Sequence, residues 1–378
     1  MTSPAVPQLP LTPLTSTSPS RFLEAQLCGL RGAWAAARTA DLLPGSPARR
    51  LGTVIHRLLE EAERVLVSGE AATAARFDVL TAAADAEMQG SWLERRNVPL
   101  AESVADYAEQ RQAAVAAATE LTADAAAHAA GGGGRRRSGA EVRLVARGGR
   151  VVGRADRILV TSRGAVIQDT KTGPVFEAAP GGGRQVKRAF ATQLRLYAAL
   201  YAEDTEVSGG AWPARLELVP PGRSPIAVPF DPASSTQLLD QAEALLDSLN
   251  RLIRQQASRT ERELRLASPS PEACRWCPYR PACVAYQEAA RGTGDLPEWP
   301  HDVWGTVADI RGLGNGTVSL TVDAAGHPVR VRGLSPDAQR HPGLDHLQPG
   351  TEVAIFSLIA QGGTSTLGEG PYTVIYPG

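Results

Sequence analysis

Three charged side chains with chemical potential lie in one short stretch, VVGRADRILVTSRGAVIQDTKTG, at residues 151–173. Two runs rich in β-branched residues, on either side of the tetrapeptide TSRG, predict a β-hairpin. Asp156 would lie on its first strand, and Asp169 and Lys171 on its second. Because residues two apart in a strand share a face, Asp169 and Lys171 should point the same way. Two carboxylates and an ammonium group can hold a divalent cation and stabilise charge on a phosphate.

A lone Asp-x-Lys is usually a surface ion pair, so the surroundings of this one decide its meaning. The flanking sequence AVIQDTKTG is otherwise apolar, where an unpaired charge is costly. A second aspartate lies in GRADRI on the predicted partner strand. A helix with a histidine precedes the hairpin, and a helix with glutamine and tyrosine follows it. These features favour a nuclease-like centre over an ordinary ion pair.

The elements before the hairpin are predicted to be helical. Residues 1–17 lack the basic and apolar segments of a signal peptide, and we expect them to be a disordered leader. A helix is predicted over 21–37, with Cys28 in its interior. The sequence LGTVIHRLLEEAERVL places an apolar stripe at helical spacing, with His56 beside it. Residues 70–130 are helical by composition and form a predicted insertion.

Residues 131–139 are predicted to form a flexible, basic loop. It is either a solvated linker or a mobile loop whose arginines neutralise the phosphates of a bound strand. A strand beginning near Glu141 then leads into the hairpin. Further strands are expected at 216–219 and 226–228, followed by a long helix over 234–266.

The sequence pattern changes after a Gly/Pro-rich linker at 291–300. Residues 301–378 contain about five short alternating strands separated by turn residues, which predicts a small all-β, OB-like barrel. Such barrels often bind single-stranded nucleic acid. A structural or protein-docking barrel is the alternative, because architecture alone does not fix function.

The four cysteines form a second constellation. Cys274, Cys277 and Cys283 are a compact triplet, and Cys28 is the only other cysteine in the chain. Four thiolates converging on one centre would use every cysteine. A structural zinc usually draws its ligands as two nearby pairs, unlike this one-plus-three division. A zinc site and free buried thiols both remain open for these residues.

Charge and hydropathy limit the other possibilities. The 39 basic and 40 acidic residues nearly cancel, so net charge does not indicate a nucleic-acid partner, and any basic surface must be local. No apolar run approaches the ~18 residues of a membrane span. We therefore expect a cytoplasmic protein with no membrane partner, whose thiols are reduced or bound to metal. No G-x-x-x-x-G-K-[ST] motif occurs, so unwinding of DNA would require a separate helicase.

In order and spacing, four motifs resemble the RecB/AddB-type branch of the PD-(D/E)XK nucleases: GTVIHRLLEEA, GRADRI, VIQDTKTG and ATQLRLYAALY. The resemblance implies an α/β, restriction-endonuclease-like core over residues 18–290, interrupted by the helical insertion. It implies that Asp156, Asp169, His56 and the main-chain carbonyl of Thr170 ligate Mg²⁺ or Mn²⁺. The remaining implied roles are activation of the attacking water by Lys171, positioning of phosphate and lysine by Gln193 and Tyr197, and a further acidic residue at Glu141.

Members of this branch that have one N-terminal cysteine and a C-x₂-C-x₅-C triplet bind a [4Fe–4S] cluster. The resemblance therefore implies a mainly structural cluster on Cys28, Cys274, Cys277 and Cys283. The function it implies is a metal-dependent DNA nuclease, an exonuclease on single strands or DNA ends, in repair, recombination or phage defence. The alternative is an iron–sulfur, DNA-end-binding accessory subunit of a helicase–nuclease complex with little cleavage of its own. An RNA-processing nuclease is a third possibility, but the sequence contains no aromatic-rich, RNP-like segment to support it.

Overall fold

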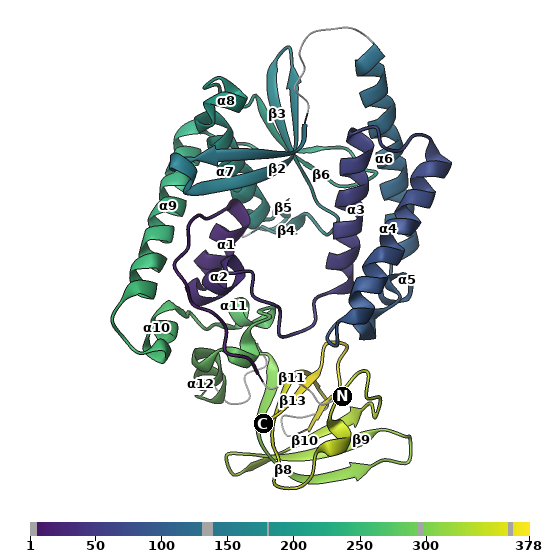
Figure 1. Cartoon of the computed structure of the whole chain (residues 1–378), viewed down its shortest axis with the longest axis vertical. Helices are drawn as coiled ribbons and strands as arrows, with labels where there is room; N and C mark the ends of the chain where they lie inside the picture. The colour runs from purple at the N-terminus through teal and green to yellow at the C-terminus, as the bar shows by residue number, and fades with distance from the viewer. Residues whose placement is uncertain (1–5, 131–138, 180, 293–297, 362–365) are drawn as a thin grey trace.

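The computed structural model describes residues 6–130, 139–179, 181–292, 298–361 and 366–378. An α/β part occupies most of the chain, and a β-barrel made by the C-terminal residues lies below it along the longest axis (Figure 1). In the α/β part, a sheet lies between two groups of helices, one that includes the helices within residues 188–254 and one that includes those within residues 47–130. None of the helices in the described part is long and apolar enough to cross a membrane.

The central sheet has the strand order β1-β2-β3-β6-β7. Its strands are β1 (Gly139–Ala146), β2 (Val151–Thr161), β3 (Gly164–Thr170), β6 (Arg215–Val219) and β7 (Ile226–Ala227). The expected hairpin is β2–β3, antiparallel and closed by two residues between Thr161 and Gly164. Strand β3 ends at Thr170, so Lys171 lies just beyond it, where its N–H donates to the carbonyl of Val219 at 3.4 Å.

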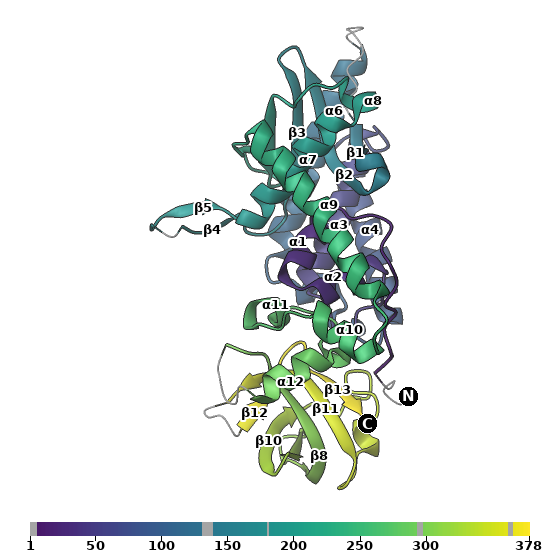
Figure 2. The ribbon, with the colours of Figure 1, turned by 90° about the vertical axis from the view of Figure 1, so that its left-hand side faces the viewer.

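Strand β3 pairs with β6 in parallel, which requires a crossover between them. Helix α7 (Arg188–Glu203) makes that crossover and packs on one face of the sheet, and α9 (Pro232–Arg254) packs outside it. The apolar core between them includes Ile167 and Leu216 from the sheet and Leu194 from the helix. A small hairpin of β4 (Phe176–Ala178) and β5 (Arg184–Val186) precedes α7 and projects from the body (Figure 2).

A helical layer lies on the other side of the sheet. It contains α3 (Pro47–Glu63), α4 (Glu70–Gly90), η1 (Arg95–Asn97), α5 (Leu100–Ser103) and α6 (Tyr107–Ala130). The apolar stripe of α3, including Leu51, Ile55 and Leu58, is buried against α4 and α6. The 70–130 region is thus helical and holds α3 in place. The predicted loop 131–139 lies outside the described residues except for Gly139, which begins β1.

The N-terminal segment is ordered where it is described, and the prediction of a disordered leader is wrong for residues 6–17. Leu9 is buried, Thr17 bridges to Val151 of β2, and Asn250 of α9 bonds both the N–H and the carbonyl of Leu14. Leucines scattered among prolines show no periodicity, so only their contacts with distant helices reveal that the segment packs. Residues 1–5 lie outside the described part.

Two predicted helices are each divided in two. The first becomes α1 (Pro19–Leu27) and α2 (Gly29–Ala36), and Cys28 lies at the break with an extended backbone (φ −160°, ψ 118°) rather than in a helix interior. A Cβ on Gly29 would come within 2.9 Å of the Leu266 carbonyl oxygen, so this corner packs tightly on another helix. The second becomes α9 and α10 (Arg259–Leu266), which begins with a capping box at Ser258.

Of the cysteine triplet, Cys274 lies in α11 (Pro271–Arg275), Cys277 follows that helix, and Cys283 lies between η3 (Arg280–Ala282) and α12 (Val284–Gly292). The C-terminal barrel, as predicted, is built of short strands. It consists of β8 (His301–Gly312), β9 (Val318–Ala324), β10 (His327–Leu334), β11 (Glu352–Ala360), β12 (Thr366–Gly368) and β13 (Val374–Pro377), with η4 (Leu344–His346) before β11. Strand β12 pairs with both β10 and β11 and closes a five-stranded ring, to which β13 adds beside β11.

A buried ion pair joins the barrel to the cysteine triplet. Arg280, 2% exposed, donates to Asp302 at 2.8 Å, to the hydroxyl of Ser357 at 2.8 Å and to the carbonyl of Cys274 at 3.0 Å. Asp302 also accepts from the Tyr286 hydroxyl at 2.6 Å. Both charges are satisfied from several directions, as a buried pair requires. The barrel is therefore fixed to the rest of the chain by directed bonds as well as by apolar packing.

Removing one partner of this pair tests the docking of the barrel. Arg280→Met leaves the Asp302 carboxylate buried and unpaired, and should lower the free energy of unfolding by about 3–5 kcal/mol. The double variant Arg280→Met/Asp302→Leu, which buries no charge, should recover part of that loss. Chemical denaturation measures both effects, and limited proteolysis should release the barrel sooner from the single variant. A single variant as stable as the wild type would contradict the assigned role.

Candidate functional site

The site lies where β3 ends beside the middle of β2, between α3 and α7. Arg157 pairs with Gln168 across the hairpin, so Asp156 and Asp169 occupy the next position on the two strands. Helix α3 brings His56 to this position from one side of the sheet, and α7 brings Gln193 from the other. The structure therefore assembles residues from four elements that are far apart in the sequence.

Asp169, only 1% exposed, is surrounded by the two groups expected to accompany it. The Lys171 ammonium lies 2.7 Å from Asp169 Oδ2, and it donates to Gln193 Oε1 at 3.1 Å. Gln193 Nε2 in turn donates to Asp169 Oδ1 at 3.3 Å. The three side chains close a triangle in which the lysine has one defined position. The ammonium also lies 4.9 Å from the centre of the Phe190 ring, a favourable cation–π distance.

Asp156 is held by the main chain and approached by the histidine. Its Oδ2 accepts the N–H of Thr170 at 2.7 Å and lies 3.6 Å from His56 Nδ1. Burial, followed by the neighbouring Asp169, raises the pKa of Asp156 to about 7. Burial also raises the pKa of Asp169. The protein alone therefore leaves the negative charge of this pair incompletely compensated.

Burial lowers the pKa of His56, although the nearby Asp169 acts in the opposite direction. A lowered pKa favours the neutral imidazole near neutral pH, the form that can donate a lone pair to a cation. His56 lies on the same side of α3 as the glutamates that follow it. The histidine is thus placed as an expected ligand rather than as a core residue.

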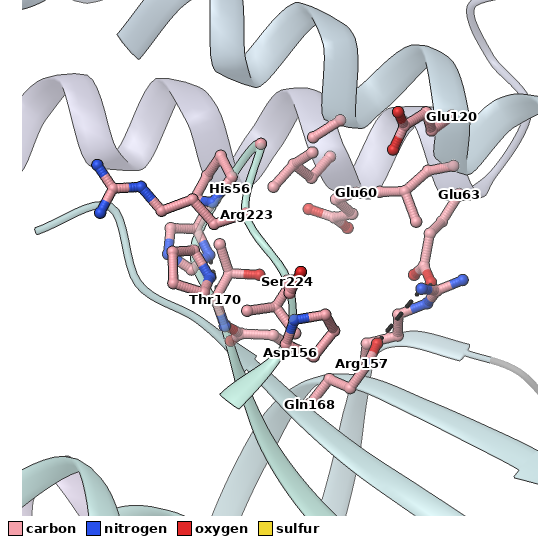
Figure 3. A pocket seen from close by; sticks show the side chains of 18 of the residues that line it. His56, Glu60, Glu63, Glu120, Asp156, Arg157, Gln168, Thr170, Arg223 and Ser224 are labelled. Carbon is pink, nitrogen blue, oxygen red and sulfur yellow. Dashed lines mark hydrogen bonds and ion pairs between the residues drawn. The ribbon is translucent and has the colours of Figure 1, made fainter. Parts of the chain in front are cut away.

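Further carboxylates surround the same cavity, and sequence reasoning missed most of them. Figure 3 shows Glu60 and Glu63 on α3, one and two turns beyond His56, and Glu120 on α6. The spacing of four residues from His56 to Glu60 was the available signal. Glu63 is engaged with Arg157 in an ion pair, so it is at least partly neutralised.

Glu141, an expected site residue, lines this cavity too. Its φ of 53° is in the left-handed region, which is uncommon for a residue other than glycine and is often found at functional sites. Burial, followed by Glu60, raises the pKa of its carboxyl. The turned backbone takes Glu141 out of the regular β1–β2 ladder at the position facing Asp156.

Tyr197 lies beside Gln193, and its expected role in positioning phosphate and lysine stays a prediction. Its buried hydroxyl donates to the carbonyl of Arg154 on β2 at 2.7 Å, and a Cβ on Gly153 would lie 2.8 Å from its ring. Tyr197 therefore acts as a packing residue that fixes β2 against α7. Gln193, one helical turn before it, is the residue that reaches Asp169 and Lys171.

The loop between β6 and β7 crosses the site toward the helical layer. A Cβ on Gly222 would lie 3.2 Å from Cβ of Ala113 on α6, so the loop and the helix are in close approach. Residues 220–223 line the cavity of Asp156 on one side and a second cavity, which contains Lys171 and Arg184, on the other. The catalytic candidates thus lie in a cleft that this loop partly bridges.

The oxygen-rich donor set fits a hard divalent cation better than a soft metal. Two adjacent buried carboxylates, one with a pKa near 7, lack the positive charge that such a cation would supply. Among the described residues, no three His, Cys, Asp or Glu side chains already surround one point at ligand distance. The candidate ligands are therefore Asp156, Asp169 and His56, which small side-chain adjustments would have to bring to a common ion.

Cys28 and the cysteine triplet are more than 240 positions apart in the sequence. All four cysteines nevertheless line one small pocket, together with Trp34 and Tyr286. The N–H of Ser268 donates to Cys28 Sγ and that of Tyr286 to Cys283 Sγ, each at 3.4 Å. Burial raises the pKa of Cys277 to about 11 and that of Cys283 to about 12, and the other thiols contribute to both shifts. Thiolates here would thus need a bound cation or cluster.

Comparison with known proteins identifies the family. The family model described as "PD-(D/E)XK nuclease superfamily" matches residues 16–284, well over half of the chain. A solved structure titled "Crystal structure of SSO0001" aligns at 17% identity over 51% of this chain and 81% of its own, with a TM-score of 0.21. A score this low supports no structural argument. The comparison with curated proteins gave no match.

Because the pKa of Asp156 is raised, ionisation of this carboxyl should lower the stability of the folded protein as the pH rises. An acid whose folded pKa lies near 7, above its ordinary 3.8, favours folding at low pH and loses that contribution as the pH rises through 7. Asp156→Asn removes this ionisation. In metal-free buffer its stability advantage over the wild type should grow by on the order of 2 kcal/mol between about pH 5 and pH 8.

Chemical denaturation at several pH values measures this difference, with the exposed Asp345→Asn of the barrel as the matched control. Added Mg²⁺ or Mn²⁺ should stabilise the wild type at the higher pH and leave Asp156→Asn nearly unchanged. Parallel pH profiles for wild type and Asp156→Asn would refute the assigned effect of this ionisation.

Proposed function

Since the chain belongs to the PD-(D/E)XK nuclease superfamily, we propose that it is a Mg²⁺- or Mn²⁺-dependent deoxyribonuclease that degrades single strands or DNA ends. Members of this superfamily are typically metal-dependent nucleases. The observation that carries the proposal is the closed triangle of Asp169, Lys171 and Gln193 beside Asp156. A purely structural ion pair would not require a second buried carboxylate next to it.

In this proposal Asp156, Asp169 and His56 would hold the cation, with the main-chain carbonyl of Thr170 as a further donor. The cation, when bound, supplies Lewis acidity toward the phosphodiester. The N–H of Thr170 fixes the orientation of the Asp156 carboxylate at 2.7 Å. This bond would limit the adjustment that Asp156 needs to reach a bound cation.

Lys171 would orient the attacking water and stabilise the charge that develops on the phosphate. Its ammonium is held at 2.7 Å from Asp169 and 3.1 Å from Gln193, which leaves its third proton for substrate. Gln193 acts as a positioning residue because it bonds the lysine and Asp169 together. Glu141 would contribute a further carboxylate at the rim of the cleft. Tyr197 would support the site through its bond to β2 and through its contact with Gln193.

A single-stranded substrate or a DNA end is supported by the bridging loop. The close approach of Gly222 to Ala113 narrows the route to Asp156, and a duplex is wider than a single strand. The glutamates around Asp156 would repel a phosphate chain that arrived without a cation. The narrowed route favours a strand that enters by its end, as in an exonuclease, and the carboxylates favour reaction only with metal present.

We further propose that Cys28, Cys274, Cys277 and Cys283 hold a [4Fe–4S] cluster of the kind found in RecB/AddB-type relatives. The convergence of all four thiols on one pocket supports a single four-ligand centre, and the one-plus-three spacing favours a cluster over zinc. The N–H groups of Ser268 and Tyr286 directed at sulfur suit cluster thiolates. Such a cluster would tie the α1–α2 corner to the segment after α10.

The accessory-subunit alternative shares these binding features but requires little cleavage. The complete set of Asp156, Asp169 and Lys171 favours an active nuclease. An ATP-driven helicase subunit is the partner this proposal predicts, because the sequence contains no phosphate-binding loop of its own. An OB-like role for the barrel in binding single strands also belongs to the proposal, as does a place in repair, recombination or phage defence.

Asp169→Ala and Lys171→Ala should each lower the rate of degradation of labelled single-stranded DNA by at least ~10²-fold, since each removes a group preorganised around the reacting phosphate. The assay compares Mg²⁺, Mn²⁺ and metal-free buffer on single-stranded, blunt and tailed DNA.

Lys187→Ala is a matched control, because Lys187 approaches the same Phe190 ring at 5.5 Å without a bond to Asp169. It should retain nearly full activity. Undiminished cleavage by both Asp169→Ala and Lys171→Ala would exclude this site as the catalytic centre. Tight DNA binding by the wild type with no turnover under any metal would favour the accessory-subunit alternative.

Protein purified without oxygen should be brown, with a broad visible absorption that bleaches on reduction and with iron and acid-labile sulfide in equal amounts. Cys28→Ser should lose most of this absorption and lower the melting temperature, because it removes the one ligand from the N-terminal corner. Ser268→Ala, which retains the N–H directed at Cys28, is the control. A colourless wild-type protein containing one zinc would contradict the cluster.

A further inference from the structure

We propose that a groove between the cysteine triplet, the 39–46 loop and the barrel binds single-stranded DNA as an extension of the active-site cleft. The groove is lined by Trp276 and Arg275 from the triplet, Ile359 and Tyr372 from the barrel, and Arg49 from α3. We call it the distal groove. This inference rests on the proposed nuclease function, because it assigns the distal groove to the same strand that is cut at Asp156 and Asp169.

Trp276 is the most informative residue of the distal groove. It is 68% exposed, whereas the other aromatic residues in the described part of the chain are buried or half-buried. It lies between Cys274 and Cys277, so its main chain is fixed by the triplet. An exposed tryptophan on a rigid segment offers a flat apolar face to solvent, which is a stacking platform for a base.

The barrel contributes further apolar residues to the lining of the distal groove. Ile359 on β11 is 46% exposed, and Tyr372 precedes β13. Ile359 and Trp276 belong to elements separated by more than 80 positions, yet both line the distal groove. Isolated exposed apolar residues need no explanation, but two that line the same groove favour a binding surface. Bases can stack or pack against such residues with little sequence preference.

Arginines around these residues can neutralise the phosphates. The Arg275 guanidinium lies 5.6 Å from the Trp276 ring, and neither Arg275 nor Arg21 has a carboxylate partner within the described residues. Arg49 is 78% exposed and only 3.9 Å from Asp41, a weak surface pair that a phosphate could replace. The combination of free guanidinium groups with exposed aromatic faces favours nucleic acid over an apolar peptide.

The distal groove adjoins the cavity that contains Lys171 through one shared lining residue. Arg49 lines both the distal groove and the cavity that contains Lys171, and residues 220–223 connect that cavity to the one around Asp156. In Figure 2, α11 of the triplet lies on the same side of the molecule as the β4–β5 hairpin, which carries Arg184 of the Lys171 cavity. A strand could thus run from the cut site to the barrel without leaving this side.

The experiment separates the distal groove from the cut site by oligonucleotide length. Binding of fluorescent oligothymidylates of about 4 and about 20 nucleotides is measured by anisotropy in the Lys171→Ala background, which prevents cleavage. Trp276→Ala and Tyr372→Ala should each weaken binding of the longer strand by about 10-fold and leave the shorter one unchanged. Trp276→Phe should largely restore the affinity, because it retains a stacking face.

Arg163→Ala at the distant β2–β3 turn serves as the control and should bind both lengths normally. Unchanged affinity of both variants for the longer strand would overturn the proposal and leave the distal groove to a protein partner. Equal weakening for both lengths would overturn it too, because the cut site itself would then be affected. Tyr372 lies outside the cysteine triplet, so its result stands even if Trp276→Ala disturbs the cysteine site.

The same proteins with Lys171 intact distinguish this proposal from the nuclease assignment. A wild type that binds the longer strand through Trp276 but cleaves no DNA would disprove the proposed function and retain the distal groove. A wild type that cleaves, with Trp276→Ala and Tyr372→Ala unchanged in both binding and cleavage of long strands, would retain the function and disprove the distal groove.

Discussion

Two carboxylates buried side by side impose the main constraint on the larger part of this molecule. Asp156, in the middle of β2, and Asp169, near the end of β3, occupy neighbouring positions, and such a pair is unfavourable unless positive charge and hydrogen bonds offset it. The offset comes from the Lys171 ammonium, the Gln193 amide and the Thr170 N–H. This offset requires β3 to end at Thr170, so that the Lys171 ammonium can reach the Asp169 carboxylate. It also requires α7 to pass close enough to Asp169 for Gln193 to bond it.

The helical layer can be understood from the same constraint. His56 reaches Asp156 only if α3 lies at a fixed distance from the sheet, and the contact between α3 and the sheet is small. Most of the apolar face of α3 is instead buried against α4 and α6. The 70–130 region thus stabilises one side of the cleft from outside, and the close approach of Gly222 to α6 bridges the gap from inside. One wall of the cleft is the sheet and the other is the helical layer, and among the described residues this loop and the strand edges connect them.

The sequence predicted what short-range patterns determine. The β2–β3 hairpin, the helix around His56, the strands of the barrel and the shared face of Asp169 and Lys171 follow from periodicities of two and 3.6 residues. It failed where contacts join distant positions. The packing of residues 6–17 depends on Asn250, and the break at Cys28 depends on Leu266 and Leu249. The glutamates near Asp156 were missed because alternating charge on a helix usually indicates only a solvated face.

The segment of the cysteine triplet adds directed bonds between parts of the chain that apolar packing also joins. Arg280, three residues before Cys283, bonds the main chain of Cys274 and also Asp302 of the barrel, while Trp276 in the same segment faces the distal groove. Any group bound by the four thiols would fix this segment and, through Arg280, the position of the barrel relative to the cleft. Loss of that group would therefore loosen the lining of the distal groove before it disturbed Asp156 and Asp169, which rest on a separate core between the sheet and α7. The chemistry at the hairpin and the guidance of the strand toward it are in this sense two separable properties of one fold.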